Sequence, residues 1–112
     1  MRNPRINQEG KAVIRHIVLF SAKRPDDIAT ILAALGRLRE IPHAAHLEVI
    51  QNARLDQHSQ EIDVIVYGEF ADAEALAHYK AHPIYQETIG IVRPLRDLRI
   101  AVDYEAPGGA QR

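Results

Sequence analysis

The amino-acid sequence predicts an α+β fold in which helices cover one face of an antiparallel sheet. Four segments have the β-branched composition and the alternation of strands, and amphipathic segments separate the first two strands and the last two. The 112 residues suffice for one domain with a single core. We therefore divide the chain into an N-terminal arm at residues 1–12, a domain at 13–105 and a C-terminal tail at 106–112.

The first predicted strand, residues 13–20, contains no Gly or Pro and is rich in β-branched and aromatic residues. Alternation places His16 on one face together with Ile14, Val18 and Phe20, and the opposite face is also mostly apolar. Two apolar faces are typical of a strand that is covered on both sides. His16 is the one polar group on its face, so we expect any chemistry of this protein to lie near it.

A helix is predicted over residues 26–41. Pro25 suits its first turn, and the aspartates that follow suit the positive end of the helix dipole. Pro42 ends the helix, because a proline disfavours helical geometry in the residue before it. Apolar residues recur at three- and four-residue spacing, which predicts a surface helix that packs on the sheet. The apolar stripe comprises Ile28, Ile31, Leu32, Leu35, Leu38 and Ile41.

Three further strands are predicted by alternation at residues 46–51, 62–70 and 98–104. Asp72 is a suitable N-cap for a second helix that runs to about His82. The proline after His82 interrupts this helix, and its ring suits the first turn of a short third helix. Both apolar segments between strands are therefore helical.

The order of strand, helix, strand, strand, helix, strand is that of the split βαβ or ferredoxin-like unit. Helices in this unit cover only one face of the sheet, yet three of the four strands carry apolar residues on both faces. An uncovered apolar face of that size is an aggregation hazard in a monomer. We therefore predict a homodimer whose two sheets face each other as a dimeric α/β barrel.

The composition excludes several classes of protein. A formal net charge of −1 argues against a nucleic-acid binder, and the absence of Cys excludes thiol catalysis. The N-terminus is too polar for a signal peptide and no apolar run is long enough to span a membrane, so we predict a cytoplasmic protein. His78 and His82 have a spacing that can chelate a metal, but we expect the helix to fray there and predict no metal site.

Three motifs occur in order along the chain. They are Arg15-His16-Ile17-Val18-Leu19-Phe20, Tyr79-Lys80-Ala81-His82-Pro83 and Val92-Arg93-Pro94-Leu95. Together they resemble the Dabb family, the stress-responsive dimeric α/β-barrel proteins, over roughly Ile14 to Glu105. The resemblance implies a ferredoxin-like protomer and a barrel-shaped dimer. It implies no particular reaction, because the fold by itself supplies none.

A functional relative within this resemblance is the plant olivetolic acid cyclase. It implies a pocket that uses a strand histidine, a helix tyrosine and a second histidine after the His-Pro pair. His16 and Tyr79 match the first two, whereas Tyr85 stands at the third position. A phenol with a pKa near ~10 cannot replace imidazole as a base at neutral pH. The resemblance therefore does not imply the complete set of catalytic groups of the cyclase.

These considerations give a candidate site with His16 and Tyr79 as catalytic residues. Its predicted substrate-binding residues are Val18, Phe20, His82 and Tyr85. The structural alternatives are an inert, hydrogen-bonded core His16, a Tyr79 ring that only packs on the sheet, and a His82 that caps the broken helix end. Arg93, Arg96 and Arg99 suggest an anion site, but an exposed rim with acidic neighbours such as Asp97 is the favoured interpretation.

Three functions remain open. The first is a small-molecule enzyme or binder, without cofactor, whose pocket supports acid–base chemistry on an enolisable or aromatic ligand. The second is a non-catalytic, stress-associated homodimer. The third is a cofactor-free monooxygenase or a polyketide-cyclase-like enzyme; the absence of Trp weakens a haem-linked version.

Overall fold

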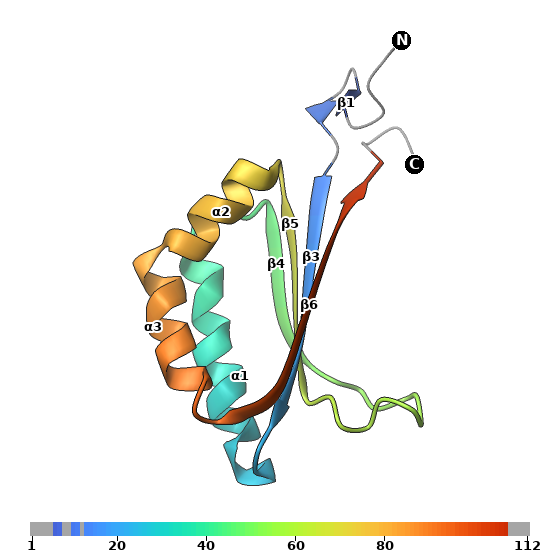
Figure 1. Ribbon diagram of the computed structural model, residues 1–112, viewed down its shortest axis with the longest axis vertical. Coiled ribbons are helices and arrows are strands. Elements are labelled where there is room, and N and C mark those ends of the chain that lie inside the picture. Colours follow the sequence, from blue (N-terminus) through green and yellow to red (C-terminus); the bar gives the residue numbers. More distant parts are fainter. Residues whose placement is uncertain (1–5, 8–9, 12, 108–112) are drawn as a thin grey trace.

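The computed structural model of the chain describes residues 6–7, 10–11 and 13–107. Its framework is a four-stranded antiparallel sheet with the order β4-β5-β3-β6 (Figure 1). The strands are β3 (Val13–Ala22), β4 (His46–Gln51), β5 (Val64–Phe70) and β6 (Arg96–Ala106). β3 is central, because it pairs with β5 on one side and with β6 on the other. This order confirms the predicted ferredoxin-like α+β fold.

The first helical segment is less regular than predicted. In place of one helix over residues 26–41, a 3₁₀ turn (η1, Pro25–Asp27) leads into α1 (Ile28–Gly36), and a second 3₁₀ turn (η2, Arg37–Glu40) follows. Helix ends often tighten in this way, because i→i+3 hydrogen bonds satisfy backbone N–H and C=O groups that have no i→i+4 partner at the end of the helix. The predicted apolar stripe nevertheless faces the sheet. Its buried members are Ile31, Leu35, Leu38 and Ile41.

Two consecutive helices, α2 (Ala73–Ala81) and α3 (Pro83–Val92), follow β5. The Asp72 carboxylate caps α2 by accepting a hydrogen bond from the Ala75 N–H at 2.8 Å, as predicted. Between the helices His82 adopts an extended conformation, because helical geometry is disfavoured before a proline. The predicted break between the second and third helices is therefore confirmed.

Several boundaries differ from the predicted ones, both within the chain and toward its ends. β5 begins at Val64, two residues later than expected, and β6 extends to residue 106, which we had placed in the tail. Ala106 pairs with the first residue of β3 and is buried. Within the predicted arm, β1 (Ile6–Asn7) and β2 (Gly10–Lys11) form a short antiparallel pair that the sequence did not predict. Residues 1–5, 8–9, 12 and 108–112 lie outside the described part of the chain.

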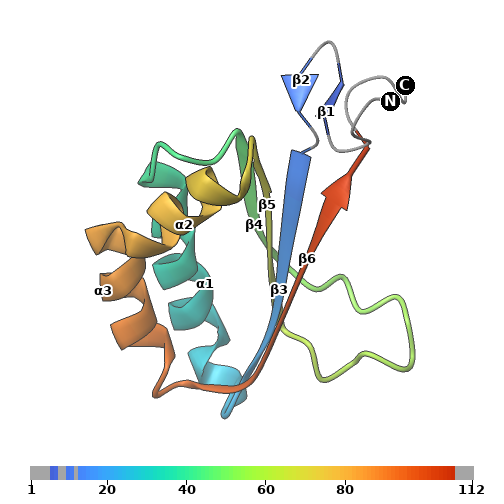
Figure 2. The ribbon, with the colours of Figure 1, turned by 45° about the horizontal axis from the view of Figure 1, so that its top comes forward.

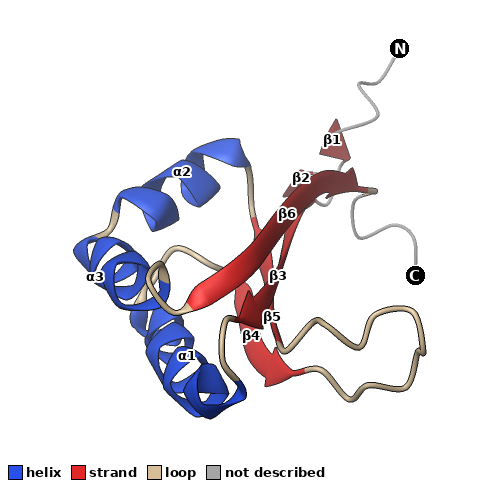
Figure 3. Cartoon of the chain, turned by 60° about the horizontal axis from the view of Figure 1, so that its bottom comes forward, coloured by secondary structure: helices blue, strands red, loops and turns tan. Residues whose placement is uncertain are grey.

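The three α-helices of the described residues lie on one side of the sheet, and none of these residues forms a helix on its other side (Figures 2 and 3). The buried core fills the space between the helices and the sheet. We call the opposite side the open face; its exposed apolar residues are Ile50, Ile100, Val102 and Tyr104. Within the described ranges, no helix is long and apolar enough to cross a membrane.

Candidate active site

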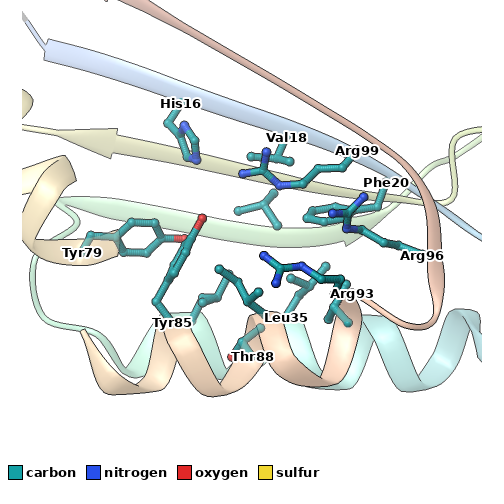
Figure 4. Close-up of a pocket in the computed structure, with 14 residues that line it drawn as sticks. His16, Val18, Phe20, Leu35, Tyr79, Tyr85, Thr88, Arg93, Arg96 and Arg99 are labelled. Carbon is teal, nitrogen blue, oxygen red and sulfur yellow. The ribbon is translucent and has the colours of Figure 1, made fainter. Parts of the chain in front are cut away.

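A cavity of about 280 Å³ lies between the sheet and the helices (Figure 4). Its walls are half apolar and half polar by residue, and the polar groups come from β3, β6, α2, α3 and the turn after α3. The apolar lining residues are Val18, Phe20, Leu35, Leu38, Val66, Ile89 and Val92. The polar lining residues are His16, Tyr79, Tyr85, Thr88, Arg93, Arg96 and Arg99. A cavity of this size in which polar groups from several elements converge is a candidate small-molecule site, and it is more polar than is usual for one.

The central strand fixes the position of His16. Its neighbours across the sheet are Gly68 on β5 and Asp103 on β6, and its side chain, 1% exposed, points toward the helices. His16 Nδ1 lies 2.6 Å from Asp103 Oδ1, a short hydrogen bond that the charge of the carboxylate strengthens. With Nδ1–H donating to the carboxylate, Nε2 carries the free lone pair of the neutral ring. Asp103 therefore holds the His16 ring with Nε2 as its unshared acceptor.

Two opposing effects act on the protonation of His16. Burial lowers the pKa of the imidazole, and it outweighs the hydrogen bond and negative charge of Asp103, which raise the pKa. The contact length alone would also suit an imidazolium–carboxylate ion pair. The neutral ring is favoured because His16 is almost fully buried, whereas Asp103 is 41% exposed and solvent screens its charge. His16 is therefore able to accept a proton at neutral pH.

Tyr79 approaches the same cavity from α2. Its ring centroid lies 6.3 Å from that of His16, 4.8 Å from that of Phe70 and 5.2 Å from that of Tyr85. The Tyr79 hydroxyl is buried and has no hydrogen-bond partner among the described residues. Burial raises its pKa, and the nearby Tyr85 adds to the effect. Tyr79 is thus a neutral hydroxyl that can donate a hydrogen bond.

Five of the six candidate residues lie around this cavity: His16, Val18, Phe20, Tyr79 and Tyr85. His82 does not line it. The His82 Nδ1 accepts a hydrogen bond from the Ile84 N–H at 3.1 Å and caps α3. We therefore reassign His82 from ligand binding to helix capping, which was its structural alternative.

The three arginines of the sequence Arg93-Pro94-Leu95-Arg96-Asp97-Leu98-Arg99 also line the cavity. In Figure 4 the three guanidinium groups lie on the side of Val18 and Phe20, and those of Arg93 and Arg99 reach toward the middle of the cavity. Within residues 13–107, no carboxylate forms an ion pair with any of them, and Asp97 is no exception. The prediction of an exposed rim fits Arg93 and Arg99, which are exposed, but no acidic neighbour among the described residues pairs with them, and all three arginines line the cavity.

The sequence did not identify Asp103 as a site residue. Alternation groups Asp103 with Ala101 and Arg99 on the less apolar face of its strand, and we had no reason to turn that face toward the helices. The register of β6 against β3 was the missing information, because it sets Asp103 directly beside His16.

The sheet order and the cavity between sheet and helices define a ferredoxin-like α+β protein with a candidate site centred on a strand histidine. A family model, the Stress responsive A/B Barrel Domain (Dabb), matches residues 14–106. The chain therefore belongs to the Dabb family. None of the curated proteins compared with the chain matches it.

Solved structures share this fold. A dimeric ferredoxin-like protein of unknown function from Thermobifida fusca is 23% identical with a TM-score of 0.72, and the match covers 93% of this chain and 99% of that one. A Dabb family protein from Mesorhizobium loti is 21% identical with a TM-score of 0.70, covering 88% and 100%. A hydroxynitrile lyase from Passiflora edulis is 16% identical with a TM-score of 0.71, covering 87% and 95%. At these identities the likeness concerns the fold alone.

Proposed function

We propose that the cavity is the active site of an enzyme that moves a proton on a small apolar or aromatic carbonyl compound. One observation carries this proposal: His16, held by Asp103, and the unpartnered hydroxyl of Tyr79 belong to the same cavity. A buried hydroxyl without a partner costs about 1–3 kcal/mol, and a ligand oxygen would remove that cost. The volume suits a single aromatic ring with small substituents, since a cavity of ~150 Å³ already holds benzene.

The proposed step is the removal of a proton from the carbon beside a carbonyl group. The C–H electron pair moves into the substrate to form an enolate, and the proton goes to His16 Nε2. The Asp103 carboxylate stabilises the resulting imidazolium through Nδ1–H. The Tyr79 hydroxyl donates a hydrogen bond to the enolate oxygen, and its raised pKa keeps it protonated. Return of the proton to the same or a different carbon regenerates the neutral ring.

Hydrogen–deuterium exchange into phenylacetone, followed by NMR in D₂O, tests this step directly. The protein should accelerate exchange at the carbon between ring and carbonyl above the buffer rate. His16→Gln should lower the acceleration by ~10²–10⁴-fold, the usual contribution of a general base. Tyr79→Phe should lower it by ~10²–10³-fold while leaving the fold intact or slightly more stable, because it removes an unpartnered buried hydroxyl.

The matched control is His58→Gln, in the exposed loop between β4 and β5, which should exchange as the wild type does. Exchange at the buffer rate, or full activity of His16→Gln, would contradict the proposed chemistry. Tight binding of ligands without exchange would instead favour a small-molecule binder that is not an enzyme.

We further propose that two chains associate through the open face. Val102 is 50% exposed there, and Ile100 and Ile50 are nearly as exposed. The part of this face near the start of β3 is polar, with a hydrogen bond from Arg15 to the Tyr104 hydroxyl at 3.2 Å. An apolar patch beside a polar network suits a contact between two copies, because the patch supplies affinity and the polar groups fix the register.

Light scattering should then give twice the chain mass at micromolar concentration. Val102→Glu should abolish the dimer and destabilise the fold, whereas a matched substitution on the helical surface, Ala33→Glu, should change neither. A well-folded wild-type monomer would exclude the dimer.

The exclusion of nucleic acid and the cytoplasmic location remain predictions from composition.

A further inference from the structure

We propose that the ligand of this cavity carries an oxyanion, a carboxylate or a phosphate ester, which binds Arg93, Arg96 and Arg99 while the apolar body extends toward His16. The inference rests on the proposed function only in requiring that the cavity binds a small molecule. It adds the chemical class and the orientation of that molecule, which the catalytic residues alone do not specify.

The connection between α3 and β6 brings the three arginines together. Arg93 directly follows α3, Arg96 begins β6, and Arg99 lies on β6 opposite Phe20. Two backbone hydrogen bonds at the Leu95 peptide fix this turn: its N–H donates to the Val92 carbonyl at 2.9 Å, and its carbonyl accepts from Lys23 at 2.8 Å. Three guanidinium groups therefore line the same side of the cavity, carried by an anchored piece of backbone (Figure 4).

The charge of these arginines is not balanced within the described part of the chain. Residues 13–107 contain eight arginines, and five have a side-chain partner. Those five are Arg15, Arg24, Arg37, Arg39 and Arg54. The three without any partner are the three that line the cavity. Like charges brought together repel each other, and a bound anion would remove that cost.

The guanidinium is well suited to oxyanions, because its fork of N–H groups matches the two oxygens of a carboxylate or a phosphate. The positive charge of Arg99 also acts on the two proposed catalytic residues. Arg99 disfavours protonation of His16 and opposes the effect of burial on Tyr79. An anion at Arg99 would thus be coupled electrostatically to the proposed base.

Strand geometry limits the length of the ligand. His16 and Phe20, the residue opposite Arg99, are four positions apart on β3, which corresponds to about 13 Å at the usual strand rise. Long arginine side chains shorten this span. A single ring with a short substituent at one end and an oxyanion at the other therefore fits both the span and the cavity of about 280 Å³.

Calorimetry with three matched probes tests the inference: 4-propylbenzoate, 4-propylphenyl phosphate and the neutral 4-propylbenzamide. We expect the better anionic probe to bind at least about tenfold tighter than the amide, since a hydrogen bond to a charged group exceeds a neutral one by that order. Tighter binding of the benzoate assigns a carboxylate ligand, and tighter binding of the phosphate assigns a phosphate ester. The preference should weaken as salt is added.

Arg93→Gln and Arg99→Gln, tested singly and together, should each weaken binding of the anion more than binding of the amide and so reduce the preference for the anion. Arg24→Gln is the matched control, because Arg24 is exposed and does not line the cavity. Equal binding of amide and anions to the wild type would overturn the inference and leave the proposed function standing. Anion preference that persists in the double variant would also overturn it. Failure of all three probes to bind would overturn both.

Discussion

Asp103→Asn separates the two effects that set the protonation of His16. The asparagine Oδ1 can still accept the hydrogen bond from Nδ1–H, so the ring keeps its orientation and loses only the neighbouring charge. Since the Asp103 hydrogen bond and charge both raise the pKa of His16 against the larger effect of burial, the substitution should lower that pKa further.

The cost in stability should be modest. Hydrogen bonds to charged groups contribute ~1.5–3 kcal/mol, and a neutral acceptor retains part of this. Because Asp103 is 41% exposed, solvent screening reduces the difference, and we expect a loss of about 1 kcal/mol at pH 7.

The pH dependence has a defined sign. The lowered pKa means that the unfolded chain binds the proton of this histidine more tightly than the folded protein does. His16 therefore adds stability that is complete above its unfolded pKa of ~6.5 and is lost as the pH falls toward the folded value. Because Asp103→Asn lowers the folded pKa of His16 further, the loss of stability in this variant should continue to a lower pH than in the wild type.

Two measurements check these expectations: the NMR titration of the His16 ring protons and urea unfolding at several pH values. Asp97→Asn, on the same strand and exposed, is the control and should leave the His16 titration unchanged. A His16 pKa that stays constant or rises in Asp103→Asn would refute the proposed balance of burial and charge. An equal effect of Asp97→Asn would show that the interaction is long-range and not specific to the hydrogen bond.

Two pairs of substitutions test the packing around the site by urea unfolding. Leu35→Ala should lower the free energy of unfolding by about 2–5 kcal/mol, toward the lower end because Leu35 already borders the cavity. Arg37→Ala should lower it by less than about 0.5 kcal/mol, because the ion pair of Arg37 is exposed. Equal losses in the two variants would contradict the orientation of α1. Gly68→Ala should cost about 1–3 kcal/mol, since its methyl group would lie 2.8 Å from the ring of Phe70. Gly90→Ala, with no atom nearby, should stabilise α3 by about 0.5–1 kcal/mol, and a loss there would contradict this difference.

Most of the fold followed from local rules. The strand alternation around His16, the cap at Asp72 and the break before Pro83 each depend on a few neighbouring residues, and each is present in the structure. The details that differ depend on partners distant in sequence. β6 extends to Ala106 because the start of β3 lies beside it, and no local pattern in the tail indicates that pairing.

The candidate site was predictable only in part. His16 and Tyr79 were identified because a polar group among apolar neighbours is visible in the sequence and because the family resemblance selects them. Asp103 was not, since it lies on the less apolar face of β6, while Ile100 and Val102 occupy the open face. The more apolar face of a strand usually marks the core, and here it points away from the helices. Only the register reveals which face meets His16.

The central claim is that the cavity beside His16 binds small molecules, and the NMR signals of the histidine rings test it most directly. The three propyl-substituted probes and phenylacetone would be added in turn to the isotope-labelled wild type. We predict a saturable shift of the His16 ring signal with at least one of them and no comparable shift of the exposed loop residue His58. A His16 signal that none of the four probes moves, or one that moves no more than that of His58, would contradict the claim.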